Sequence, residues 1–417
     1  MPTVYKSADF SQLYRQFKSS AGIDDLVSLH SLLELGDDYL CFSGLGEHIE
    51  LLEKGCAVFA KRRDFLKVRQ AEIAKLSARI SAVTELDGLI ELHRRLNVVA
   101  IELFLKGVGV MEIHALITSY RHRLTEKVIS LVSERLAPLP CDFTWFNMGS
   151  DGRREQTFFT DQDNALVYEM DGSPEIDGCF ENFAKEVVTA LDRVGFALCT
   201  GNIMPSNPDW RGSLHEWHRK MDHIFHDQSQ DNLLQVIILM DVTYSAGSLT
   251  LGQQMIDKVH QMIHDNFGAL MVMARSAVLS NVALTMFNKL RLEKSGDHRG
   301  MFNVKLFGWA PLIMTARVFA LKYGDTDTNT VARIKNLEAQ KHFDAELSQN
   351  LQKAYRILAH AKMVSQVEAI VTGRKYDYYL DPETLKGDGQ AELRRALVSV
   401  EALQKLAYNC FFGSGGL

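Results

Sequence analysis

The sequence predicts an α+β protein that is mostly helical, with a small α/β unit between two helical regions. Apolar residues recur at helical spacing towards both ends of the chain, two prolines interrupt this pattern near residue 138, and short aromatic or β-branched runs follow the prolines. Such repeats indicate amphipathic helices, whereas short apolar runs indicate buried strands. The predicted domains are an N-terminal helical region (1–136), an α/β domain (137–250) and a C-terminal helical bundle (251–417).

Composition limits the class of protein. The chain has 417 residues, 46% of them hydrophobic, and a net charge of −6, as expected of a globular protein with several domains. This charge gives no general attraction to nucleic acid or to an anionic membrane, so neither is expected as a partner. No apolar run approaches the ~20 residues that span a bilayer, and the N-terminus lacks the apolar segment of a secretory signal. Six scattered cysteines without a CxxC pair favour a reduced, cytoplasmic compartment.

Helices are predicted for most of the first 136 residues. One helix carries apolar residues at steps of three, four and three, namely Ile73, Leu76, Ile80 and Val83. A second helix is predicted over 110–135. Pro138 and Pro140 then stop helix formation, because proline lacks a backbone donor and biases the preceding residue towards extended geometry.

Beyond the prolines the pattern changes to short apolar runs. Buried strands are predicted at 143–146 and 165–168, a helix at 184–193 and a third strand at 195–199. Residues 201–212 contain two prolines and are predicted to be loop. From about residue 229 onward the helical pattern returns and continues to the C-terminus.

Two aspartates stand directly before the second predicted strand, in the stretch GSDGRREQTFFTDQDN that begins at Gly149. Residues i and i+2 of an extended chain point to the same side, so Asp161 and Asp163 present their carboxylates together. Unpaired, the two groups repel, and a divalent cation removes the repulsion. Oxygen ligands suit Mg²⁺ or Mn²⁺. The alternative is an aspartate-rich turn before a strand, which needs no ligand.

Small residues open the same stretch. Gly149 and Ser150 follow a predicted strand, where glycine lets the backbone approach a ligand closely and backbone amides can bind phosphate oxygens. Arg153 is close enough in the sequence to add a charge-assisted contact to the same phosphates. A phosphate-binding turn followed by paired carboxylates is an arrangement suited to metal-assisted transfer of a nucleotidyl group.

The string G-S, ten residues, then D-x-D is similar to the signature of the DNA polymerase β-like nucleotidyltransferase superfamily. The fuller string, in which Gly152, Arg153, Glu155, Gln156 and Thr160 also match, resembles the putative nucleotidyltransferases of bacterial signal-transduction proteins. Members of that family are often fused to CBS or cyclic-nucleotide-binding domains and are related to the PII-protein uridylyltransferases. The stretches GNIMPSNPDWRGSLHEW and VKLFGWAPLIMTARVFALKYG resemble further blocks of the family, so the resemblance covers roughly residues 95–412.

The resemblance implies roles for single residues. Gly149 and Ser150 hold the triphosphate of an NTP substrate, and Asp161 and Asp163 are the catalytic residues and the ligands of Mg²⁺. Arg153 and Glu155 support the loop or the nucleotide; the alternatives are surface ion pairs for Arg153 and a loop-bracing role for Glu155.

Lys305 lies in a loose basic stretch near the start of the second resembling block. The functional interpretation is that Lys305 reaches the triphosphate or the acceptor. The alternative is that this stretch is a solvated loop between helices.

One difference from the superfamily stands out. A third carboxylate usually lies on a later strand, but the predicted strand at 195–199 contains no acid, and Asp209 and Asp222 lie farther on. Two hypotheses follow. The first is an Mg²⁺-dependent enzyme that transfers a nucleoside monophosphate from an NTP to a hydroxyl, for instance a protein tyrosine as in PII uridylyltransferases. The second is a catalytically weak or inactive nucleotide-binding module that acts through a protein partner.

Overall fold

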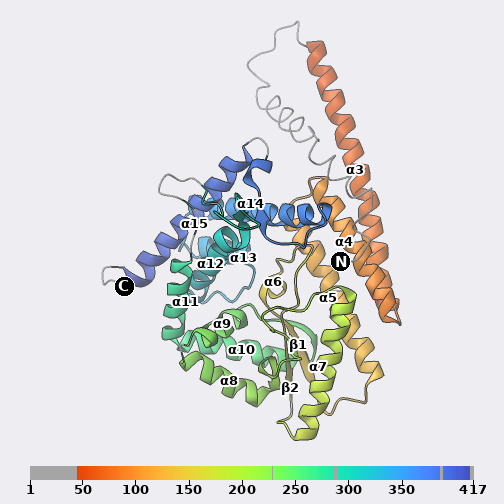
Figure 1. Ribbon diagram of the computed structural model, residues 1–417, viewed down its shortest axis with the longest axis vertical. Coiled ribbons are helices and arrows are strands. Elements are labelled where there is room, and N and C mark those ends of the chain that lie inside the picture. The colour runs from red at the N-terminus through yellow and green to blue at the C-terminus, as the bar shows by residue number, and fades with distance from the viewer. Residues whose placement is uncertain are drawn as a thin grey trace.

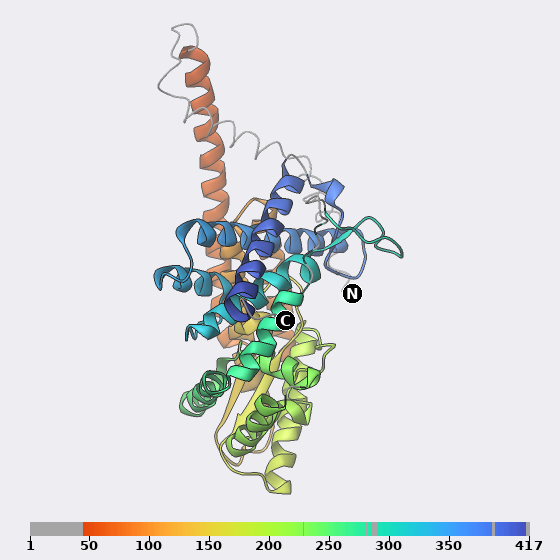
Figure 2. The same ribbon diagram turned by 90° about the vertical axis from the view of Figure 1, so that its left-hand side faces the viewer.

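The structure is a computed structural model that describes residues 45–227, 229–280, 282, 284, 290–385 and 388–413 (Figure 1). Helices predominate around one small mixed sheet, which confirms the predicted α+β, mostly helical class. The first described element is the long helix α3 (Leu45–Ala82), whose N-terminal end projects from the rest of the described chain in both views (Figure 2). Within the described ranges, no helix combines the length and apolar character required to cross a membrane.

Two further helices complete the N-terminal region. These are α4 (Leu86–Leu105) and α5 (Val110–Arg135), and α5 matches the predicted helix over 110–135. It ends shortly before Pro138, as the prolines predict. Its buried side includes Ile113, Ile117, Leu124 and Val128, which recur at helical spacing and pack into the main apolar core. The α4 and α5 helices both contact α7 (Pro174–Val194), a helix of the α/β unit.

The sheet has the strand order β3-β2-β1-β4. Its strands are β1 (Phe143–Asn147), β2 (Asn164–Tyr168), β3 (Arg211–Ser213) and β4 (Thr243–Gly247). The central strand β1 is antiparallel to both β2 and β4, whereas β2 is parallel to β3. The predictions of strands at 143–146 and 165–168 are therefore confirmed.

Both faces of this sheet are buried. Trp145 and Leu166 point into the core that contains α4, α5 and α7. Their neighbours Phe146 and Val167 point into a second core, formed with α8 (Leu214–His226) and α10 (Leu249–Asp265). Because successive strand residues face opposite sides, a sheet covered on both faces needs strands that are apolar throughout, as FTWFN and NALVY largely are.

Two predictions about the sheet were wrong. Residues 195–199 form no strand: Gly195 ends α7 in a left-handed conformation, and the segment makes only one isolated parallel bridge, between Asp161 and Ala197. The third strand is instead β3, within the residues predicted as loop. The fourth, β4, lies where helices were predicted; Thr243 and Tyr244 are β-formers, but a strand of five residues has little periodicity of its own.

The C-terminal part is a helical bundle, as predicted. Its long helices are α9 (Gln230–Leu239), α11 (Phe267–Leu279), α12 (Ala310–Lys322), α13 (Thr330–Ala339), α14 (Ala345–Val371) and α15 (Gly389–Phe412). A two-stranded sheet of β5 (Phe302–Asn303) and β6 (Tyr379–Leu380) lies beside α14. Strand β5 is followed in the chain by a π-helical turn, η4 (Lys305–Trp309). Together β5, β6 and η4 carry Lys305 and Tyr378 to the candidate site.

Candidate functional site

The loop between β1 and β2 begins with a single helical turn, α6 (Gly149–Gly152). Gly149 has a φ of 56°, and a Cβ atom there would lie 2.3 Å from a carboxylate oxygen of Asp163. A Cβ atom on Gly152 would lie 1.8 Å from the backbone oxygen of Asp241. Both glycines are therefore required by close approach, the first to an aspartate of the motif and the second to the segment before β4.

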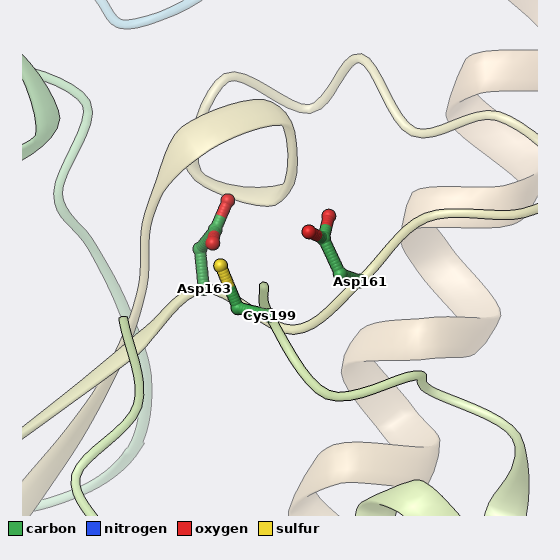
Figure 3. A group of neighbouring side chains, drawn as sticks. All are labelled: Asp161, Asp163 and Cys199. Carbon is green, nitrogen blue, oxygen red and sulfur yellow. The ribbon is translucent and has the colours of Figure 1, made fainter. Parts of the chain in front are cut away.

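The carboxylates of Asp161 and Asp163 point to the same side, and the thiol of Cys199 lies beside that of Asp163 (Figure 3). One ligand atom from each of the three residues lies within 4.8 Å of the others. The intervening Gln162 points the other way, where its amide donates to the carbonyls of Val188 and Phe196. The prediction that Asp161 and Asp163 present their carboxylates on the same side of the chain is therefore confirmed.

Neither carboxylate of the pair forms a salt bridge with a lysine, arginine or histidine among the described residues. One oxygen of Asp163 is buried without a hydrogen-bond partner. Burial, and then the charge of Asp161, raise the pKa of Asp163 to about 6. Burial and the nearby Asp163 raise the pKa of the Cys199 thiol to about 12. The site thus concentrates negative charge that the charges of Arg153 and Lys305 offset only in part.

These residues fit a divalent cation. The unpartnered oxygen of Asp163 points to a missing ligand, because buried polar atoms normally have a partner. Two carboxylates and a thiol are all groups that bind divalent ions, and here their ligand atoms lie within 4.8 Å of one another. Asp161, Asp163 and Cys199 are therefore the residues that could hold a metal.

Ser150 lies on the α6 turn, and its hydroxyl donates to the side-chain oxygen of Gln156 (3.2 Å). The hydroxyl of Thr160 donates to the same oxygen. Gln156 and Thr160 thus brace the loop from within. The amides of the first turn of a helix have no partner inside that helix, so the turn of Gly149 and Ser150 can offer donors to an anion.

Arg153 and Glu155 lie in a different environment, a buried ion cluster with Asp241, Arg317 and Arg333. The guanidinium of Arg153 donates to Glu155 (2.9 Å) and to Asp241 (2.6 Å). Arg317 and Arg333 donate to the same Asp241 carboxylate. Burial opposes ionisation of Asp241, but the arginines outweigh it and hold its pKa below the usual value.

This cluster joins the loop to the C-terminal bundle. Arg317 belongs to α12 and Arg333 to α13, and the second oxygen of Glu155 accepts a hydrogen bond from the amide of Thr330 (2.7 Å). Glu155 therefore braces the loop, as one of the two predicted alternatives has it. The ion pair considered between Arg153 and Glu155 does form, but it is buried rather than at the surface, and Arg153 shares it with Asp241 from another part of the fold. Direct contact of either residue with nucleotide stays a prediction.

Lys305 is exposed at the start of η4, and its ammonium lies 4.6 Å from the ring centre of Tyr378. Its charge is one of the smaller causes that lower the pKa of Asp163. Burial, and then the charges of the aspartates, raise the pKa of Tyr378. Contact of Lys305 with a triphosphate or an acceptor stays a prediction.

A second lysine, Lys362 of α14, is buried near the same place. Its ammonium lies 5.4 Å from the ring centre of Trp309 and 5.6 Å from that of Tyr378. Burial, together with the charge of Lys305, lowers the pKa of Lys362 to about 7. Lys305 and Lys362 therefore both lie near the ring of Tyr378, and the charge of Asp161 affects the pKa of both Lys362 and Tyr378.

Sequence reasoning missed Cys199, Lys362 and Tyr378. Cys199 ends the segment that was predicted as a strand, and a single cysteine without a nearby partner carries no metal-binding pattern. Lys362 and Tyr378 come from helices and turns far along the chain, and only the β5–β6 pairing brings Tyr378 beside Lys305. No local signal in the sequence identifies either residue.

A separate cavity of about 910 Å³ lies beside α5, β4 and α10. Its walls include Thr118, Asp151, Thr243 and His260, but not Asp161, Asp163 or Cys199. This cavity therefore does not contain the carboxylate pair. We identify the candidate site by the chemistry of its side chains, not by the volume of a cavity.

Two protein-family models match the chain. Residues 94–231 match the model described as "Putative nucleotidyltransferase DUF294". Residues 268–411 match the model described as "Putative nucleotidyltransferase substrate binding domain". The first match contains the loop with both aspartates, and the second contains Lys305, Lys362 and Tyr378. A search of curated proteins finds no match.

Proposed function

The chain belongs to the nucleotidyltransferase family that these two models describe, and we propose that it transfers a nucleoside monophosphate from an NTP to a hydroxyl with the help of Mg²⁺ or Mn²⁺. One observation carries the proposal: Asp161 and Asp163 converge without any cationic partner among the described residues, beside the glycine turn of α6. A pair of carboxylates left uncompensated in this way costs free energy unless a ligand supplies the opposite charge.

The positions of the two lysines support an NTP as the substrate. A triphosphate bound between the aspartates and the C-terminal bundle would place its negative charge near Lys305 and Lys362. Gly149 and Ser150 would bind phosphate oxygens through backbone amides. In this arrangement the loop and the bundle each supply half of the nucleotide site.

A bound divalent ion would polarise the α-phosphate and favour loss of the hydroxyl proton of the acceptor. The residues of the chain supply the rest. Asp161 and Asp163 hold the charge in place, the α6 turn fixes the phosphates, and Lys305 stabilises negative charge on the departing pyrophosphate. Such positioning and electrostatic stabilisation account for most of the acceleration in phosphoryl-type transfers.

We propose a protein tyrosine as the acceptor, from the resemblance to PII uridylyltransferases. The family match at 268–411 is to a substrate-binding domain, which is the part of the chain expected to contact the acceptor.

Incubation of the full chain with α-labelled NTPs, Mg²⁺ or Mn²⁺ and lysate from the host cell tests the proposal. Label is expected on a macromolecule in the presence of the native protein and of the control variant Asp192→Asn, an exposed acid on α7. Asp161→Asn and Asp163→Asn are expected to abolish labelling. Equal labelling by all four proteins would refute the assignment of the aspartates.

A second candidate is a regulatory module that binds nucleotide without turnover. Cys199 favours it, because among the described residues the group of possible metal ligands at the carboxylate pair contains this thiol and no third acid. Thermal stabilisation by one NTP with a divalent ion, without release of pyrophosphate under any condition tried, would support this candidate over transfer.

A further inference from the structure

Cys199 is held in register with the two aspartates by backbone hydrogen bonds on both sides. The amide of Gln162 donates to the carbonyl of Ala197 (2.9 Å), and the amide of Asn164 donates to the carbonyl of Ile203 (3.0 Å). The turn that carries Cys199 is closed by a bond from the amide of Asn202 to the carbonyl of Cys199 (3.0 Å). The thiol is therefore fixed beside the carboxylates by the same backbone that positions them.

The sulfur of Cys199 lies close enough to both aspartates to share a ligand with them. One ligand atom from each of the three residues lies within 4.8 Å of the others. A metal ion binding here would displace the thiol proton and gain the sulfur and both carboxylates as ligands.

The chemistry of the donor set then decides which ion is preferred. Mg²⁺ takes oxygen ligands, whereas thiolates select softer ions such as Zn²⁺ and bind Co²⁺ more strongly than Mg²⁺. A third carboxylate in place of the sulfur would give an all-oxygen set.

We propose that Cys199 is the third protein ligand of the divalent ion held by Asp161 and Asp163, and that it makes the site selective for thiophilic ions such as Co²⁺ and Zn²⁺ over Mg²⁺. This inference rests on the metal site of the proposed function but not on transfer itself. Cys199 thus determines metal specificity at a site whose other ligands are oxygens.

Anaerobic titration of the full chain with Co²⁺ tests the inference without measuring turnover. Coordination by a thiolate gives an intense sulfur-to-cobalt charge-transfer absorption in the near ultraviolet. The band is expected in the native protein and in Cys179→Ser, an exposed cysteine on α7 that serves as the control. Cys199→Ser is expected to lose the band and to bind Co²⁺ at least about 10–100-fold more weakly, the usual cost of losing even an outer-shell partner of a metal ligand.

Cys199→Asp gives the complementary result. It is expected to lack the band, to bind Mg²⁺ more tightly than the native chain does, and to bind Co²⁺ with less advantage over Mg²⁺. A band that persists in Cys199→Ser, or Mg²⁺ affinity that is unchanged in Cys199→Asp, would overturn the inference.

Two further readouts separate the possible failures. If Cys199→Ser does not fold, Asp163→Asn replaces it: a Co²⁺ ion held jointly by the sulfur and this carboxylate must bind more weakly in that variant, while the band returns at saturating Co²⁺ because Cys199 is retained. Metal binding to the native chain without a band would reject sulfur ligation and leave the proposed function standing. Absence of any metal binding, with or without NTP, would reject both.

Discussion

Two charged pairs occupy the loop between β1 and β2, and they end in opposite environments. Arg153 and Glu155 are buried, and every charge has a partner within the cluster around Asp241. Asp161 and Asp163 converge on each other and have no cationic partner among the described residues. The sequence pattern makes both pairs look equally functional. Charge compensation separates them: the paired charges fix the loop to the bundle, and the unpaired charges are available to a ligand.

The largest expected effect tests the compensated half of this comparison. Asp241→Asn leaves three buried arginines without their shared carboxylate. Removal of one partner from a buried ion network typically costs about 3–5 kcal/mol, because the remaining charges stay desolvated. The free energy of unfolding, measured by urea denaturation, is expected to fall by that amount. Lys185→Ala, which breaks an exposed pair with Glu181, is the control and should change it by less than about 0.5 kcal/mol.

The second effect concerns the buried lysine that faces the uncompensated pair. The pKa of Lys362 is about 7 in the folded protein and near 10.5 in the unfolded chain. Between these values the unfolded chain holds a proton that the folded protein has lost, so the free energy of unfolding rises with pH through that window. The rise from pH 7 to pH 10 is expected to be about 2–4 kcal/mol greater in the native protein than in Lys362→Met. Parallel pH profiles of the two proteins would contradict burial of an ionisable Lys362.

The third effect tests the uncompensated half. Asp161→Asn and Asp163→Asn are expected to lower the rate of nucleotidyl transfer at least about 100-fold, since each removes a charge that a bound cation needs. Unlike Asp241→Asn, they should leave the free energy of unfolding unchanged or raise it, because they remove mutual repulsion. Rates and unfolding curves measured on the same preparations check both statements. A large loss of stability in either variant would place the aspartates with the structural charges.

The smallest effect concerns the glycine turn α6, which precedes both pairs in the chain. Gly149→Ala places a Cβ atom against Asp163 and forces a left-handed conformation on a residue with a side chain. The expected loss is about 1–2 kcal/mol in the free energy of unfolding, with weaker binding of metal at Asp163. Gly178→Ala on α7 is the matched control, because open space surrounds it; it is expected to stabilise the chain by up to about 1 kcal/mol. Equal effects of the two substitutions would remove the argument for close approach at Gly149.

The sequence by itself determined the helical class, the two central strands and the convergence of Asp161 and Asp163. These features depend on local periodicity: helices repeat at 3.6 residues, strands alternate, and an i, i+2 pair in an extended chain shares one side. The GS…DxD spacing adds the glycine turn. All of this information lies within short segments, so it can be read without knowing the rest of the fold.

Only the tertiary structure decided which charged residues are left for a ligand. Asp241, Arg317 and Arg333 are far from Arg153 in the sequence, and no periodicity relates them, yet their ion pairs take Arg153 away from the surface. Cys199 is likewise distant in the sequence from the aspartates. It lies beside them because an irregular turn is hydrogen-bonded to the segment that carries them. Charge compensation depends on distances between segments that the chain brings together only on folding.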